Sequence, residues 1–269
     1  MSNLPVSLRL KSRFVATPFE GIAKTMRHII SYPRQLKHPE LAELYLEDAN
    51  IERILAKRLS ADACGVDVGC HIGSFLSLLC RYAPRGSHVA IEASPEKSEW
   101  LKKKFPLVSV RSVAVGDENG TAIFSEDIDR PGYSSLNDRE LSSHVNKYEV
   151  QVRTLDGLLS DRPRVDFIKI DIEGGELNAL KGATAVVARH RPIIMFECGS
   201  EWSLNQKQIS RRELFDMFSE KLGYSIYTAT DLLFEKGPLG FDEFRKCGLF
   251  PFRAFNFFAL PECDGGEIS

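Results

Sequence analysis

The stretch Gly65-Val66-Asp67-Val68-Gly69-Cys70-His71-Ile72-Gly73-Ser74 decides the fold of this chain. Its apolar start predicts a short buried strand, its glycines predict a tight turn, and the residues from Ser74 to about Tyr82 have the spacing of an amphipathic helix. Free N–H donors at a helix N-terminus suit the polar end of a nucleotide-like ligand. Gly69 and Gly73 follow the spacing Gly-x-x-x-Gly, which argues against the Gly-x-Gly-x-x-Gly loop of dinucleotide-binding proteins.

An acid ends each of the first two predicted strands. Asp67 follows the apolar start of the first strand, and its carboxylate can hold an ammonium group or order the loop. His88 to Glu92 reads as the second strand. In nucleotide-binding α/β sheets an acid at this point accepts hydrogen bonds from the two ribose hydroxyls. The alternative is a surface glutamate, but the glycine turn roughly 20 residues earlier favours ribose binding for Glu92.

A second chemical centre runs from Val165 to Glu176, in the sequence Val-Asp-Phe-Ile-Lys-Ile-Asp-Ile-Glu-Gly-Gly-Glu. It predicts a buried strand, an acid at its end, a glycine turn and a helix. Because the carboxyl ends of parallel strands meet at one edge of a sheet, Asp171 should face the same edge as the two acids of the first strands. Acids here can also complement a helix N-terminus. We accept that role for Glu176. Three acids around one glycine turn, with Asp171 and Glu173 as the other two, are more than the capping of a helix needs.

A further strand, Pro192 to Cys198, again ends in an acid. Glu197 therefore joins Asp171 and Glu173 as a candidate general base, or as part of an oxygen-ligand metal site. No residue is assigned to a metal, and Mg²⁺ is compatible with these acids without being indicated by them.

The middle of the chain predicts more strands and one long loop. Val108 to Val115 is a β-branched run and reads as the third strand. Ala114 and Asp117 follow as candidate adenine contacts, although Asp117 suits a turn in Gly-Asp-Glu-Asn-Gly equally well. Two further strands, 121–124 and 149–152, enclose the polar loop 125–147. A loop of that length is a lid, a binding element or disorder, and its expected ordered part is Gly132-Tyr133-Ser134-Ser135-Leu136.

Composition excludes several classes of protein. The chain has 269 residues, of which 27% are charged and 43% hydrophobic, with a net charge of -2. These values give no general attraction to nucleic acid or to a membrane. Its 6 cysteines form no C-x-x-C pair, no apolar run approaches a membrane span, and the N-terminus lacks a signal-peptide core. We therefore expect a cytoplasmic protein with reduced cysteines.

The first 38 residues are basic and partly apolar. They form either an amphipathic arm for an anionic surface or a cap packed on the main domain, and we favour the cap.

Taken together, these motifs resemble the FkbM family of S-adenosylmethionine-dependent methyltransferases. The resemblance covers about Cys64 to Cys198, and its most specific part is Lys-Ile-Asp-Ile-Glu-Gly-Gly-Glu. The segments that carry it are Asp67 to Gly73, Ile91-Glu92-Ala93-Ser94-Pro95, Ala114-Val115-Gly116-Asp117, Thr154-Leu155-Asp156 and Ile168 to Glu176.

The resemblance implies an α/β fold with a Rossmann-like, seven-stranded, mostly parallel sheet, as in class I methyltransferases, whose last strand is antiparallel. We expect a basic arm and helical extension (1–60), a methyltransferase domain (61–262) with a lid-like loop (125–147), and a C-terminal tail (263–269). The implied reaction is O-methylation of a hydroxyl on a small molecule or sugar. Neither nucleic acid nor a transmembrane segment is expected as part of this function, and a homodimer is compatible with it.

The same resemblance implies roles for the strand-end residues. Asp67, Gly69 and Gly73 would surround the methionine part of S-adenosylmethionine, Glu92 the ribose, and residues 114–117 the adenine. Asp171 would lie nearest the transferred methyl group. The neighbouring motif residues His71 and Ala93 complete the cofactor-binding set.

Physical chemistry agrees with acids at this position. The methyl donor is a sulfonium cation, and transfer needs an acceptor oxygen aligned behind the methyl at roughly 3 Å. Asp171 is our candidate for accepting the hydroxyl proton, with Glu173 and Glu197 as substitutes. Two other classes stay open: a non-catalytic S-adenosylmethionine- or nucleotide-binding protein of the same fold, and a nucleotide-dependent oxidoreductase. The second glycine-rich turn that an oxidoreductase would need is not seen.

Overall fold

The computed structural model describes residues 12–17, 19–21, 32–33, 35–127, 129, 144–207 and 209–262. The segment Gly132 to Leu136, most of the predicted 125–147 loop, much of the basic arm and the tail 263–269 lie outside the described residues. Within the described part of the chain, no helix has the length and apolar character needed to cross a bilayer.

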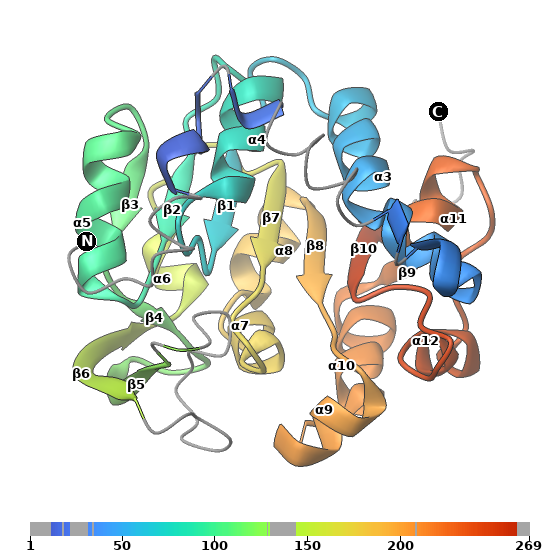
Figure 1. The fold of residues 1–269 in the computed structure, drawn as a ribbon. Helices are drawn as coiled ribbons and strands as arrows, with labels where there is room; N and C mark the ends of the chain where they lie inside the picture. The colour runs from blue at the N-terminus through green and yellow to red at the C-terminus, as the bar shows by residue number, and fades with distance from the viewer. Residues whose placement is uncertain are drawn as a thin grey trace.

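The centre of the molecule is a seven-stranded sheet in the order β3-β2-β1-β7-β8-β10-β9 (Figure 1). β10 runs antiparallel to both of its neighbours, and the other pairs are parallel. The inner strands β1 and β7 are buried on both faces because helices cover both sides. The mostly parallel sheet with an antiparallel last strand is therefore confirmed. The strands are β1 (Gly65–Val68), β2 (Val89–Ile91), β3 (Ser109–Arg111), β7 (Phe167–Ile170), β8 (Ile193–Glu197), β9 (Tyr224–Thr228) and β10 (Asn256–Pro261).

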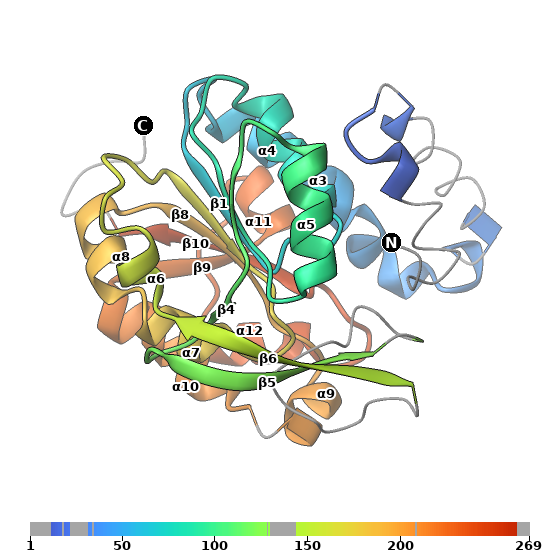
Figure 2. The same ribbon diagram turned by 90° about the vertical axis from the view of Figure 1, so that its left-hand side faces the viewer.

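Helices form a layer on each face of this sheet, as the view along the sheet shows (Figure 2). One face is covered by α3 (Ala42–Arg58), α4 (Ser74–Tyr82), α5 (Pro95–Lys104) and α11 (Ala229–Leu233). The other face is covered by α6 (Leu155–Leu158), α7 (Glu176–Lys181), α8 (Thr184–His190), α10 (Arg211–Asp216), the π-helical segment η3 (Met217–Leu222) and α12 (Phe241–Cys247). The short η1 (Pro39–Leu41) precedes α3, and α9 (Glu201–Lys207) follows β8.

A second sheet has three strands in the order β4-β6-β5. They are β4 (Ala114–Val115), β5 (Gly120–Asp127) and β6 (Val145–Arg153). The prediction of one third strand over 108–115 was wrong, because β3 pairs with β2 whereas β4 pairs with β6. β5 and β6 also extend into the predicted loop, pairing as far as Asp127 and Val145. A β-branched run predicts strand conformation, but it does not say which partner each half of the run will find.

The described part of the N-terminal segment packs on the main sheet's helices. Val15 is buried with Ile72 and Leu76, in the cluster that lies against α4 and α5. Glu20 is also buried, and its carboxylate accepts a hydrogen bond from the Ser77 hydroxyl at 2.7 Å. These are the contacts expected of a cap.

Candidate active site

The glycine turn after β1 lies against the turn after β7. Gly69 has a φ of +80°, and a Cβ added there would lie 1.8 Å from the Asp171 carbonyl oxygen. Gly73 has a φ of +79°, and its Cβ would lie 2.6 Å from the Phe105 ring. Both positions therefore require glycine because protein atoms fill the space where a side chain would be. This contact brings the two chemical centres of the sequence together.

Glu92 ties this turn to the segment after β2. Its buried carboxylate accepts hydrogen bonds from the His71 N–H at 2.7 Å and the Ser94 N–H at 2.9 Å. Burial raises the pKa of Glu92, and the Lys97 ammonium opposes that effect. An ionised carboxylate has about four acceptor positions, so these two bonds leave capacity for further donors.

Lys97 and Glu126 form a buried ion pair that sequence reasoning missed. The Lys97 Nζ and the Glu126 Oε1 are 2.9 Å apart, with side-chain exposures of 2% and 6%. The Ser94 hydroxyl also donates to Glu126, at 3.4 Å. Because Glu126 lies on β5 and Lys97 on α5, the pair joins the second sheet to the segment that holds Glu92. No signal in the sequence linked these two positions.

Lys169 lies between the acids that follow β1 and β7. Its ammonium is 2.9 Å from the Asp171 Oδ2 and 3.6 Å from the Asp67 Oδ1. Asp67 is fully buried and Lys169 is 7% exposed. The longer distance is that of an ion pair rather than a hydrogen bond, and neither oxygen of Asp67 has a hydrogen-bond partner among the described residues. Sequence reasoning gave Lys169 no role, although a lysine inside an apolar strand was a visible signal.

The pKa directions follow from this geometry. Burial raises the pKa of Asp67, and the Lys169 ammonium opposes that change. For Asp171, burial also acts to raise the pKa, but Lys169 outweighs it, so the pKa lies below its usual value. Burial works against the charge of Lys169, yet the two carboxylates raise its pKa. Asp171 is therefore ionised and Lys169 is charged.

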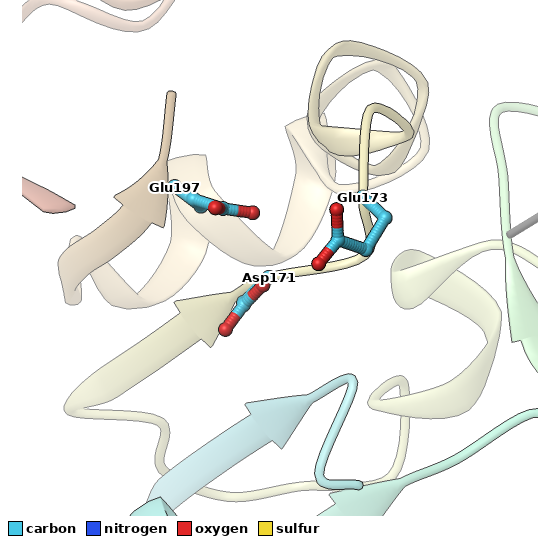
Figure 3. Close-up of side chains that lie close together, drawn as sticks. All are labelled: Asp171, Glu173 and Glu197. Carbon is cyan, nitrogen blue, oxygen red and sulfur yellow. The ribbon is translucent and has the colours of Figure 1, made fainter. Parts of the chain in front are cut away.

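Asp171, Glu173 and Glu197 come together at the carboxyl edge of the sheet, as the sequence predicted (Figure 3). One oxygen of each lies within 4.8 Å of the others, and all three side chains are half-buried. Glu197 comes from the end of β8, and Glu173 from the turn after β7, with a φ of +55°. Burial, and then the charges of Asp171 and Glu173, raise the pKa of Glu197 well above its usual value. Such a trio could also hold a hard cation, which the structure does not assign.

The Asp171 and Glu197 carboxyl groups approach each other, with one oxygen of each within 4.8 Å. Their pKa values shift in opposite directions, because Asp171 lies next to the Lys169 ammonium whereas Glu197 is buried beside other acids.

Glu176 supports the turn that carries Asp171 and Glu173. Its Oε1 accepts hydrogen bonds from the Ile172 N–H at 3.0 Å and the Gly174 N–H at 3.1 Å. Burial raises the pKa of Glu176 to about 7 despite these bonds. The side chain at the start of α7 thus serves the local backbone, in line with the capping role expected for it.

Two of the residues predicted to bind the cofactor lie in one apolar cluster. Ala93 and Ala114 belong to it, together with Phe124 and Tyr148 of the second sheet. Asp117 is exposed in the bend after β4, and its contact with adenine stays a prediction.

Glu47 of α3 positions the strand next to Glu197, a role that the sequence did not suggest. Its Oε1 accepts hydrogen bonds from the Phe255 N–H at 2.8 Å and the Asn256 N–H at 3.0 Å, and its Oε2 accepts one from the Asn256 side chain at 2.8 Å. Asn256 is the cross-strand partner of Glu197. The helix before the glycine turn therefore helps to shape the acidic end of β8.

Comparisons with known proteins give one family and several relatives. The family described as Methyltransferase FkbM domain matches residues 67–226, more than half of the chain. A curated protein from Beauveria bassiana (strain ARSEF 2860), Methyltransferase 1, is 25% identical over 145 residues, covering 45% of this chain and 58% of that protein. The chain thus spans less than two thirds of that relative's length.

Solved structures of methyltransferases are similar in part. Methyltransferase FkbM from Methylobacillus flagellatus KT is 20% identical with a TM-score of 0.46, covering 76% of this chain and 44% of that chain. An O-methyltransferase from Bacillus cereus, in complex with SAH, is 13% identical with a TM-score of 0.43, covering 78% of each chain.

Proposed function

Because the chain belongs to the FkbM methyltransferase family, we propose that it transfers the methyl group of S-adenosylmethionine to a hydroxyl oxygen of a small molecule or sugar. The observation that carries this proposal is the pair formed by Asp171 and Glu197. The Asp171 carboxylate, held by Lys169 at 2.9 Å, lies within 4.8 Å of the Glu197 carboxyl group at the end of the next strand.

The residues at the carboxyl edge fit S-adenosylmethionine. The Asp67 carboxylate is fully buried and lies 3.6 Å from the Lys169 ammonium, so its part in this proposal is negative potential beneath the glycine turn, which favours a cationic ligand. Glu92 has acceptor capacity for a ribose diol, and the apolar pair Ala93 and Ala114 suits one face of an adenine ring. When bound, the cofactor supplies an electrophilic methyl group on a positively charged sulfur.

Asp171 is the proton acceptor in this proposal. The Asp171 carboxylate would accept the proton that the acceptor hydroxyl gives up on methylation, and S-adenosylmethionine, when bound, would supply the methyl group. A general base of this kind contributes roughly 10²–10⁴-fold to a rate. Lys169 favours the ionised form of Asp171 from 2.9 Å, and Glu197 lies beside that carboxylate. Glu173, 4.8 Å or less from both, adds negative potential that favours a cationic donor.

The test combines cofactor binding with turnover. Calorimetry should show that S-adenosylmethionine binds, and a screen of hydroxylated acceptors with labelled cofactor and mass-spectrometric detection should find the methylated product. Asp171→Asn should lose at least about 10²-fold in turnover while remaining folded, although its melting temperature should fall because the ion pair with Lys169 is lost. Glu99→Gln, a change at an exposed acid on α5, is the control and should keep full activity.

Two results would contradict the proposal in different ways. Full activity of Asp171→Asn would exclude Asp171 as the base. Binding of S-adenosylmethionine without transfer to any acceptor in the screen would favour the non-catalytic binding protein.

A further inference from the structure

The segment between α12 and β10 carries a row of aromatic rings. The rings of Phe250 and Phe252 lie 5.8 Å apart, and those of Phe252 and Phe255 lie 5.2 Å apart, measured between centroids. Phe250 is 64% exposed, whereas Phe252 and Phe255 are half-buried. The row therefore runs from the start of β10 to the surface.

A further exposed aromatic side chain, Trp202, lies on a neighbouring element. It is 68% exposed at the start of α9. The N–H of Glu201, which precedes it, donates to the Gly248 carbonyl at 3.0 Å, so α9 begins beside the aromatic segment. We call Trp202, Phe250, Phe252 and Phe255 the aromatic rim.

The aromatic rim is fixed in place by polar contacts. The Arg253 guanidinium pairs with Glu43 of α3 and with Asp231 of α11, each at 3.1 Å. The Glu47 carboxylate accepts the Phe255 N–H at 2.8 Å. The segment is held in place, yet its large apolar side chains remain in contact with water, which is energetically unfavourable. Exposed apolar side chains on a fixed segment are typical of a binding surface.

The aromatic rim begins next to the acidic end of β8. The Cys198 N–H donates to the Phe255 carbonyl at 2.8 Å, and Asn256 is the cross-strand partner of Glu197. The row of rings therefore starts one residue from the cross-strand partner of Glu197.

The charges nearby limit what the ligand can be. Asp171, Glu173 and Glu197 gather at this edge, and Lys169, the cation in contact with Asp171, is already shared with Asp67. A phosphate, sulfate or carboxylate on the ligand would meet like charge here, whereas an uncharged ring could stack on the phenyl groups.

We propose that the aromatic rim is the acceptor subsite, and that it takes an uncharged molecule whose hydroxyl is borne on an apolar ring. This inference rests on the proposed function and specifies its substrate class. It predicts that anionic acceptors such as sugar phosphates are rejected.

The experiment measures binding with a matched pair of probes, 2-naphthol and 2-naphthyl sulfate, which share one ring system and differ in charge. Equilibrium dialysis is run on the full chain loaded with S-adenosylhomocysteine. We expect 2-naphthol to bind more tightly than its sulfate ester. Phe250→Ala and Trp202→Ala should each weaken 2-naphthol binding about three- to tenfold. Both side chains are exposed, so the fold should be unaffected.

Phe234→Ala is the control variant. Phe234 is 65% exposed, almost the same as Phe250, but it lies beside Glu235, which pairs with Lys57 at the opposite end of α3 from Glu43. Its loss should leave 2-naphthol binding unchanged.

Several results would overturn the proposal. Equal binding of 2-naphthol to Phe250→Ala, Trp202→Ala and Phe234→Ala would do so, as would equal binding of the sulfate ester. Phe250→Ala could instead bind 2-naphthol as tightly as the native protein does. If it then no longer binds phosphatidylcholine vesicles, the rings belong to a membrane-binding surface, and if it no longer forms a dimer in gel filtration, they belong to an interface with a second copy. Calorimetry with S-adenosylmethionine separates the proposed function from the proposed acceptor subsite. If the protein does not bind S-adenosylmethionine, the proposed function is refuted. If it binds S-adenosylmethionine but the aromatic-rim variants bind 2-naphthol as the native protein does, only the acceptor subsite is refuted.

Discussion

Replacing Lys169 by methionine tests the electrostatic arrangement of the site most directly. The change keeps the length of the side chain and removes the charge that lies 2.9 Å from Asp171 and 3.6 Å from Asp67. Breaking a buried ion pair by removing one partner costs about 3–5 kcal/mol, because the remaining charge stays buried without compensation. We expect the free energy of unfolding of Lys169→Met to fall by about that amount near neutral pH.

The loss should depend on pH in a defined direction. In the native protein the pKa of Asp171 is lowered, so its contribution to stability is present above its unfolded pKa of about 4 and is lost as pH falls through the folded value. Without Lys169, burial raises the pKa of Asp171 above the unfolded value. In the variant, the contribution of Asp171 to stability is then present below its unfolded pKa of about 4 and is lost as pH rises through the raised folded pKa. The deficit of the variant should therefore be largest near neutral pH and shrink toward about pH 4.

Urea unfolding at about pH 4.5 and about pH 7.5 measures both effects, and Lys169→Arg is the matched variant that keeps the charge. Turnover should fall with the ionised fraction of Asp171 in Lys169→Met and be partly retained in Lys169→Arg. A Lys169→Met protein within about 1 kcal/mol of the native protein at both pH values, or one with a deficit that does not change with pH, would refute the reasoning.

Three further outcomes are expected. Glu92→Ala should weaken S-adenosylmethionine binding in calorimetry, and unchanged affinity would show that the ribose assignment is wrong. Gly69→Ala should lower the free energy of unfolding by about 2–4 kcal/mol, because the new Cβ would meet the Asp171 carbonyl oxygen at 1.8 Å, whereas Gly120→Ala, with no atom within 4 Å of its Cβ, is the control for urea unfolding. Glu176 has a folded pKa of about 7 against 4.5 for the free group, so its contribution to stability is present below pH 4.5 and lost as pH rises through about 7; Glu176→Gln should flatten that pH dependence in thermal unfolding.

The main sheet could be predicted because its strands are short apolar runs that end in acids or glycine turns. Parallel strands bring their carboxyl ends to one edge, so acids at the ends of these strands were expected to gather there, as Asp171, Glu173 and Glu197 do. The need for glycine at positions 69 and 73 could also be predicted. The atoms that a side chain would meet at these positions belong to the protein itself.

The sequence did not show which strand each strand would pair with, or which side chains far apart in the chain would meet. The run 108–115 has one strand-like pattern but divides between two sheets at Ser112 and Val113. The contacts of Glu47 with Asn256 and of Lys97 with Glu126 join positions far apart in the chain. Local pattern fixes which residues are extended or helical, whereas such pairings depend on how the layers pack.

Register explains why two chemically similar acids at one edge differ in proton affinity. In β7, Lys169 lies two residues before Asp171, and side chains two apart share a face of the sheet. In β8, the residue two before Glu197 is Met195, and the register pairs Met195 directly with Lys169. Asp171 therefore has an ammonium beneath it on its own strand, and Glu197 has a thioether. The cation stabilises the charged form of Asp171, whereas Glu197 is left with burial and neighbouring acids. The position of one lysine in the register is thus enough to lower the pKa of the first acid while the pKa of the second is raised.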